Sequence, residues 1–176
     1  MTMNPTFEPY GGYALTNLHQ AGGEETLRFE AFVTLHGRKV LHVSNGGVGG
    51  SHRYQPVTYD WAGFRATLAT FEGYAVGWNA GSEFAGYEDA DQLVNRLIDV
   101  AALNRMRVVP FVLDGGDYWQ TGECHRFTRS ATREQVIAAL TGPEYAHRTP
   151  RVWEKAVGDF VLVGDVVGEP VDGECP

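Results

Sequence analysis

Residues 28–45 read RFEAFVTLHGRKVLHVSN, and their pattern sets the architecture of the chain. In residues 28–35 the apolar side chains recur at nearly every second position, which predicts a strand. The turn at residues 36–39 leads into a second apolar run at residues 40–44, and the two runs should pair as an antiparallel hairpin. Strands that pair as hairpins, rather than alternating singly with helices, indicate an α+β fold.

Helical spacing follows this hairpin. Between residues 58 and 71 the large apolar side chains lie at i, i+3, i+7 and i+10, one stripe of an amphipathic helix, and they are Trp61, Phe64, Leu68 and Phe71. Asp60 is the expected N-cap of this helix, and Gly73 is the expected stop.

Two more helices are predicted downstream. Residues 88–107 carry acidic side chains early and arginines late, which matches the helix dipole, and an apolar face between them. Thr132 and Gln135 form a capping box, so a third helix should begin there and end at Gly142.

A second hairpin is predicted between the second and third helices. Residues 108–113 would form its first strand, residues 114–117 a glycine-containing turn, and residues 118–127 the returning strand. Residues 151–156 are predicted to add a short helix, and residues 160–163 a last strand.

The length and composition suit one domain. With 176 residues and 43% hydrophobic content, the chain can bury a core without help from a metal or a disulfide. We therefore expect a single compact α+β domain over residues 1–158, with both hairpins in one sheet packed by two to three helices. Residues 159–176 contain acidic and no basic side chains, which predicts an acidic C-terminal tail with room for the strand at 160–163.

Charge and cysteine content limit the partners and the compartment. The chain has 14 Lys and Arg against 22 Asp and Glu, a net charge of −8, which disfavours direct nucleic-acid binding. No window is apolar enough for a membrane span, and the N-terminus has no signal-peptide pattern. The two cysteines, Cys124 and Cys175, make no disulfide framework. We expect a cytoplasmic protein.

The most unusual segment is the loop NGGVGGSHRY at residues 45–54, directly after the hairpin. Closely spaced glycines allow successive N–H groups to point into a concavity that suits an anion such as phosphate. The loop matches neither the dinucleotide fingerprint nor the P-loop, so the other interpretation is a plain connection between hairpin and helix. Its candidate contact residues are Asn45, Gly46, Gly47, Gly49, Gly50, Ser51, His52, Arg53 and Tyr54.

A second candidate contact region is residues 74–87, where glycines alternate with aromatic residues. Exposed aromatic side chains on a glycine-rich loop are typical of contact surfaces, and Trp78, Phe84 and Tyr87 are the candidates here. The alternative is a loop that is fixed for structural reasons alone.

Part of the chain resembles a group of small uncharacterised proteins found in phages, plasmids and bacterial genomes. The residues that carry the resemblance are LHGRKV at 35–40, VSNGGVGG at 43–50 and Tyr54, followed by residues 105–121, which match the group's helix, strand and turn layout. The resemblance brings no known activity with it. An origin on a mobile element implies a small protein that antagonises a host system.

No catalytic or metal-binding pattern is present in the sequence. The histidines and cysteines form neither C-x-x-C nor H-E-x-x-H, so no metal and no cofactor is predicted. The only candidate for general-base chemistry is His52, beside the hydroxyl of Ser51.

Three functions follow from these observations, and a non-enzymatic role ranks above an enzymatic one. The first is a binding protein that antagonises a host defence system by contacting a protein partner through its glycine- and aromatic-rich loops. The second is a module that sequesters a nucleotide-like anion on the loop from Gly46 to Gly50. The third is a small hydrolase that uses His52.

Overall fold

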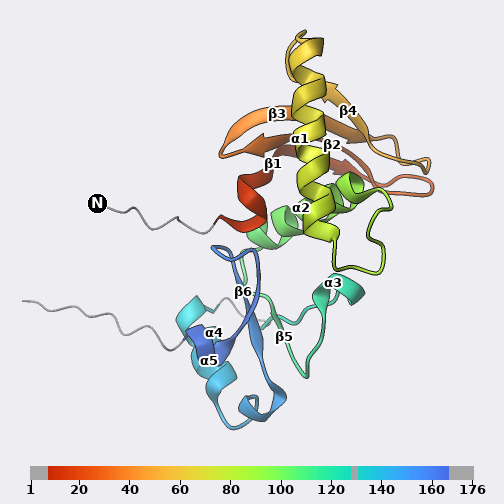
Figure 1. The fold of residues 1–176 in the computed structure, drawn as a ribbon. Helices are drawn as coiled ribbons and strands as arrows, with labels where there is room; N and C mark the ends of the chain where they lie inside the picture. The colour runs from red at the N-terminus through yellow and green to blue at the C-terminus, as the bar shows by residue number, and fades with distance from the viewer. Residues whose placement is uncertain (1–7, 128–130, 167–176) are drawn as a thin grey trace, which may run out of the picture. The chain divides into compact units, whose positions relative to one another are not determined.

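The computed structural model describes residues 8–127 and 131–166, and the predicted α+β class is confirmed. The described residues form two antiparallel sheets, one of four strands and one of three, with helices connecting the strands (Figure 1). In chain order the elements are η1 (Pro9–Gly12), β1 (Tyr13–Ala21), β2 (Arg28–Leu35), β3 (Arg38–Asn45), β4 (Arg53–Pro56), α1 (Trp61–Asn79), α2 (Asp89–Arg105), β5 (Phe111–Val112), α3 (Tyr118–Thr121), α4 (Arg133–Thr141), η2 (Ala146–Arg148), β6 (Arg151–Glu154), β7 (Asp159–Leu162) and α5 (Val163–Val166). The chain divides into two compact units, residues 1–102 and 103–176.

The first unit is a four-stranded sheet with one covered face. The strands lie in the order β1-β2-β3-β4, each antiparallel to its neighbour, and α1 and α2 contribute to the core on one side of them. The fully buried side chains of this core are Val33, Leu41, Val43, Phe71, Ala75, Leu93 and Val94. Because side chains alternate across a strand, the other face of the sheet carries mainly polar residues.

The predicted hairpin is confirmed as β2 and β3. Phe29, Ala31 and Val33 are buried in the core, and the residues between them point to the open face. Phe32, which breaks the strict alternation in the sequence, lies on the open face, where the ammonium of Lys39 sits 4.1 Å from the centre of its ring. A cation–π contact of this kind lets an aromatic side chain remain on a polar surface.

The outer strands β1 and β4 were not predicted. The predicted loop position of Arg53 and Tyr54 is wrong, because both belong to β4, which pairs with β3. In β1 the alternation is interrupted by a bulge between Thr16 and His19, with Asn17 at a φ of 53°. The bulge puts Leu18 into the core, and His19, which pairs with Glu30, onto the open face.

The first helix begins as predicted but ends later. The side chain of Asp60 accepts a hydrogen bond from the Gly63 N–H at 2.9 Å, as expected for an N-cap. The predicted stop at Gly73 is wrong, since α1 continues to Asn79. Phe71, Ala75 and Asn79 recur at i, i+4 and i+8 and are buried, so their packing outweighs the cost of about 1 kcal/mol for a glycine inside a helix.

The second helix is confirmed as α2, whose buried face includes Leu93, Val94 and Leu97. In the apolar stripe predicted for α1, by contrast, Trp61 is 59% exposed and does not join the core. None of the helices in residues 8–127 and 131–166 is both long and apolar enough to cross a membrane.

The second unit differs from the predicted hairpin. Its strand β5 covers only Phe111 and Val112, and residues 118–127 do not form the predicted returning strand. Asp117 instead accepts a hydrogen bond from the Trp119 N–H and caps the short helix α3, which ends at Gly122 with a φ of 69°. A single bridge to Phe111 is all the strand pairing that this segment makes.

The partner of β5 is β6, which lies where a short helix was predicted at residues 151–156. This prediction is wrong, since residues 151–154 are extended and pair with β5. Successive side chains of a strand point to opposite faces, and here both Val152 and Trp153 are buried. The strands therefore form two separate sheets, β1–β4 and β5–β7, instead of one. The predicted third helix is confirmed as α4, including the capping box of Thr132 and Gln135.

The last described residues belong to the second unit. The strand predicted at residues 160–163 is confirmed as β7, one residue earlier, and α5 follows it with Val163 buried. Residues 159–166 of the predicted acidic tail form β7 and α5, and the remainder of the tail lies outside the described residues. The single domain over residues 1–158 stays a prediction, although each unit has a buried cluster of its own.

Candidate functional site

The glycine loop is fastened to the turn that joins β1 and β2. The carbonyl oxygen of Gly47 accepts hydrogen bonds from the backbone N–H groups of Glu24 at 2.8 Å and Glu25 at 3.0 Å. The N–H of Gly47 donates to the Asn45 side chain at 2.8 Å, and that of Gly49 donates to the Thr26 hydroxyl at 3.4 Å. These two N–H groups are used inside the protein, so they are not part of an open anion nest.

Asn45 holds the loop from the inside. It ends β3 and is 5% exposed. Its Oδ1 accepts from the Gly47 N–H and the Thr26 hydroxyl, while its Nδ2 donates to the carbonyl of Gly50 at 3.1 Å and faces His52 Nδ1 at 3.1 Å. Since the Gly47 N–H can only donate, the atom of the Asn45 amide that faces it must be the oxygen, Oδ1.

His52 is a structural histidine in this arrangement. The Asn45 amide presents N–H to Nδ1, so Nδ1 is an acceptor and the proton of the neutral ring lies on Nε2. Nε2 then donates to Asn95 Oδ1 at 3.1 Å. The ring packs edge-on against Phe29 at 4.9 Å, and its side chain is 8% exposed. Both nitrogens are occupied, which gives the hydrolase interpretation no free general base.

Asp91, at the start of α2, ties β4 and the glycine loop to this helix. One carboxylate oxygen accepts the backbone N–H of His52 at 2.6 Å, and the other accepts the hydroxyl of Tyr54 at 2.7 Å. Burial, followed by the hydrogen bond to Asp91, raises the pKa of the Tyr54 phenol far above its ordinary value. Tyr54 therefore stays protonated and keeps donating.

This raised pKa predicts a loss of stability in alkali. Above about pH 10 the unfolded chain gives up the Tyr54 proton while the native state keeps it, so the unfolded state binds fewer protons and the free energy of unfolding falls as pH rises. For Tyr54→Phe we expect a shallower fall, by up to about 1.4 kcal/mol per pH unit. Urea denaturation of both proteins across this range measures the difference. Parallel curves would show that Tyr54 ionises normally in the native state.

Ser51 makes its hydrogen bond to a carboxylate and not to the neighbouring histidine. Its hydroxyl donates to Glu88 Oε1 at 2.5 Å. Glu88 adopts a φ of 48°, a left-handed backbone conformation that is uncommon for residues other than glycine. The Ser51 and His52 side chains therefore do not form the nucleophile–base pair that a hydrolase needs.

These residues border a depression of about 360 Å³ between the glycine loop, β4 and the two helices of the first unit. Four carboxylates contribute to its lining, and no lysine or arginine does. The lining residues are Ser51, His52, Tyr54, Glu72, Val76, Glu88, Asp89, Ala90 and Asp91. Asp89 and Asp91 are buried and hydrogen-bonded, whereas Glu72 and Glu88 are exposed. Among the described residues, no group of three histidine, cysteine or carboxylate side chains is arranged to hold a metal ion.

The loop between α1 and α2 lies beside this depression and is held in one conformation by its own hydrogen bonds. Buried Asp89 accepts from the Asn79 amide at 2.6 Å and from the Gly86 N–H at 3.0 Å. The amide of Gln92 donates to the carbonyls of Tyr87 at 2.5 Å and Phe84 at 3.3 Å. The contacts from Asp89 and Gln92 are therefore made to the backbone of the loop, at Gly86, Phe84 and Tyr87.

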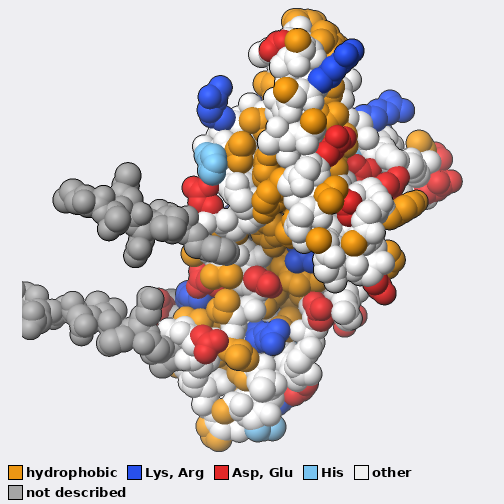
Figure 2. Space-filling view, in the orientation of Figure 1, with side chains coloured by type: hydrophobic (Ala, Val, Ile, Leu, Met, Phe, Trp, Pro, Cys, Tyr) orange, Lys and Arg blue, Asp and Glu red, His pale blue; other side chains and the backbone are white. Residues whose placement is uncertain are grey.

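The aromatic side chains of this loop are left on the surface. Phe84 is 59% exposed and Tyr87 is 69% exposed, and Val76, which lines the depression, is 55% exposed. Figure 2 shows apolar side chains on the surface over the C-terminal end of α1 and the loop that follows it. We call Val76, Phe84 and Tyr87, with the carboxylates of Glu72 and Glu88, the display surface.

No family model, no curated protein and no solved structure matches this chain.

The structure divides the predicted contact residues into three groups. Ser51, His52 and Tyr54 border the depression, and Phe84 and Tyr87 lie on the loop next to it. The second group holds the glycine loop together and consists of Asn45, Gly47, Gly49 and Gly50, whose carbonyl accepts from the Asn45 amide. The third group is Gly46 and Arg53, which line the open face of the sheet.

The predicted loop position of Trp78 is wrong. It belongs to the last turn of α1, where it is half-buried. Its ring packs against Tyr10 at 6.5 Å, and the guanidinium of Arg96 lies 5.5 Å from its centre. Trp78 thus supports the end of α1 and is not part of the display surface.

The acidic residues that line the depression are not among the predicted contact residues. Glu72 and Val76 are four residues apart and share one face of α1, but this signal is visible only if the helix is known to continue past Gly73. From its place in the sequence, Asp91 indicates only a favourable charge in the first turn of a helix. Its contacts to His52 and Tyr54 cross 39 and 37 residues, and no local pattern announces them.

Proposed function

We propose that this protein is a non-enzymatic binding protein that contacts a protein partner through the display surface. The observation that carries the proposal is a loop whose backbone is fixed by Asp89 and Gln92 while Phe84 and Tyr87 remain exposed. A loop fixed in advance loses less conformational entropy on binding. Aromatic side chains at such positions supply much of the binding energy in protein interfaces.

The charges of the display surface favour a basic partner segment. The depression beside the loop is lined by carboxylates and by the exposed aliphatic side chain of Val76, with no lysine or arginine. Glu72 and Glu88 are both exposed, so their carboxylates can meet a guanidinium or ammonium group at the surface, with Glu88 Oε1 also accepting from Ser51. The partner proposed here is therefore a segment with an arginine or lysine next to apolar side chains.

The effect of this binding follows from the resemblance of the hairpin and glycine loop to small phage and plasmid proteins. That resemblance favours a host protein as the partner, and the blocking of a host defence system as the outcome. The internal use of both His52 nitrogens favours binding over hydrolysis.

Selection of peptides tests the proposal without knowledge of the natural partner. A random peptide library displayed on phage is selected on the full chain, and the dissociation constant of the best peptide is measured by fluorescence anisotropy. We expect selected peptides with arginine or lysine beside apolar residues. We expect Tyr87→Ala and Glu88→Gln each to weaken binding about tenfold or more.

Matched control variants separate the display surface from general stickiness. Tyr59→Ala removes a tyrosine that is 98% exposed elsewhere in the first unit, and Glu123→Gln removes an exposed carboxylate of the second unit. Both should bind the peptide like the wild type. The proposal is wrong if no peptide is enriched, or if the test and control variants weaken binding equally.

A further inference from the structure

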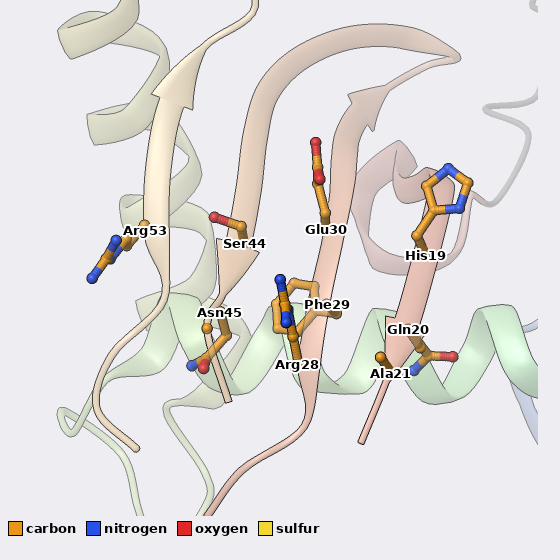
Figure 3. Close-up of a pocket in the computed structure, with 10 residues that line it drawn as sticks. His19, Gln20, Ala21, Arg28, Phe29, Glu30, Ser44, Asn45 and Arg53 are labelled. Carbon is orange, nitrogen blue, oxygen red and sulfur yellow. The ribbon is translucent and has the colours of Figure 1, made fainter. Parts of the chain in front are cut away.

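The open face of the four-stranded sheet carries a second depression, away from the display surface. It has a volume of about 430 Å³, within the usual range for small-molecule sites. It is lined from all four strands by His19, Gln20, Ala21, Arg28, Phe29, Glu30, Ser44, Asn45, Gly46 and Arg53. Figure 3 looks onto this face, with the helices behind the sheet.

Strand register puts the polar side chains of this depression in one row across the sheet. His19 pairs with Glu30, Glu30 pairs with Ser44, and Ser44 pairs with Arg53, so these four residues point to the same face. In Figure 3 the side chains of His19, Glu30 and Ser44 rise side by side from β1, β2 and β3. The row depends on the bulge in β1, because without it His19 would turn to the core side.

Two arginines give the depression a positive charge in a chain whose net charge is −8. Arg28 begins β2 and Arg53 begins β4, and both are exposed. In the described part of the chain, neither guanidinium makes an ion pair or a hydrogen bond. The one carboxylate present, Glu30, already accepts from His42 Nε2 at 2.9 Å.

We propose that this depression binds a small phosphorylated molecule that also carries hydroxyl groups, such as a nucleoside monophosphate or a sugar phosphate. Guanidinium groups bind phosphate oxygens through charge-assisted hydrogen bonds, and Arg28, at the start of the inner strand β2, is the anchor. Arg53 lies on the edge strand and adds the second positive charge. Glu30 follows Arg28 by two residues on β2, and Ser44 is the cross-strand neighbour of both Glu30 and Arg53. Both are suited to accept or donate hydrogen bonds with ligand hydroxyls.

This site takes over the anion-binding role that the sequence suggested for the glycine loop. The Gly47 and Gly49 N–H groups donate inside the protein, whereas Gly46 borders the depression on the sheet. The glycine loop therefore forms one wall next to the arginines and is not itself the cradle.

Isothermal titration calorimetry of the full chain with four probes tests the proposal: adenosine 5′-monophosphate, ribose 5-phosphate, inorganic phosphate and adenosine. We expect the two phosphorylated organic molecules to bind, inorganic phosphate to bind more weakly, and adenosine to give no signal. Arg28→Gln and Arg53→Gln should each raise the dissociation constant about tenfold or more. Arg38→Gln is the matched control, because Arg38 starts β3 at the opposite end of the hairpin.

Three results would overturn the proposal. The first is no binding of either organic phosphate at millimolar concentration. The second is binding that Arg28→Gln and Arg38→Gln weaken equally, which would mean general charge attraction. The third is equal affinity for inorganic phosphate and the organic phosphates, which would remove the role of Glu30 and Ser44. None of these results bears on the display surface, since its test uses other residues and other probes.

Discussion

The variant Asn45→Ala is expected to lower the free energy of unfolding by about 2–4 kcal/mol. Alanine removes an amide that is 5% exposed and makes two contacts at each end. The N–H of Gly47 loses its acceptor inside the protein, and Nδ1 of His52 loses its donor. Leaving buried polar groups without partners costs more than a hydrogen bond contributes on average, so the loss should exceed that of an ordinary polar deletion.

Asn95→Ala is the matched control for this prediction. Asn95 also contacts the His52 ring, at Nε2, but it is exposed, so water can replace its amide. We expect this change to cost about 1 kcal/mol or less. Urea denaturation followed by circular dichroism measures both variants. Equal losses for the two would show that the Asn45 amide does not organise the loop.

The parts of the fold that the sequence predicted are those in which local signals and tertiary packing agree. The β2–β3 hairpin has alternating apolar residues and a two-residue turn with Gly37 at a φ of 79°. The helix α4 has a complete capping box, and α2 has both an apolar face and a favourable charge distribution. In each case the information lies within one stretch of the chain.

The parts that could not be predicted depend on contacts made elsewhere in the chain. The bulge at Asn17 hides the alternation of β1, and α1 passes Gly73 because Ala75 and Asn79 find buried positions. In the second unit, residues 151–154 become a strand because β5 lies alongside them. A segment of four residues is too short for its hydrophobic pattern to distinguish a strand from a helix.

The sequence singles out segments near the candidate site but not the contacts within it. Both segments contribute to the lining of the depression, residues 45–54 through Ser51, His52 and Tyr54, and residues 74–87 through Val76. The internal use of the glycine N–H groups could not be foreseen, since their partners Asn45 and Thr26 show no motif of their own. The same is true of Arg28, which only the strand register brings near Arg53.

The variant Gly47→Ala is expected to be considerably less stable than Gly50→Ala, although both glycines have nearly the same left-handed backbone, with φ values of 80° and 81°. An alanine Cβ at position 47 would lie 2.8 Å from the Cα of Gly23 and 3.0 Å from the Cβ of Arg28. Distances this short force the backbone to move. The carbonyl of Gly47 would then lose its hydrogen bonds to the turn between β1 and β2.

At position 50 an alanine Cβ meets nothing within 4 Å, so Gly50→Ala should cost only the conformational penalty of about 1–2 kcal/mol. Gly47→Ala should add about 1–3 kcal/mol for the overpacking against Gly23. Because the φ angles match, the difference between the two free energies of unfolding, measured in urea, isolates the backbone contact between the two loops. Equal losses would mean that this contact is not formed in solution. A large difference would mean that glycine at position 47 is required by the close approach of Gly23, so that the glycine-rich loop owes at least this residue to packing and not to a ligand.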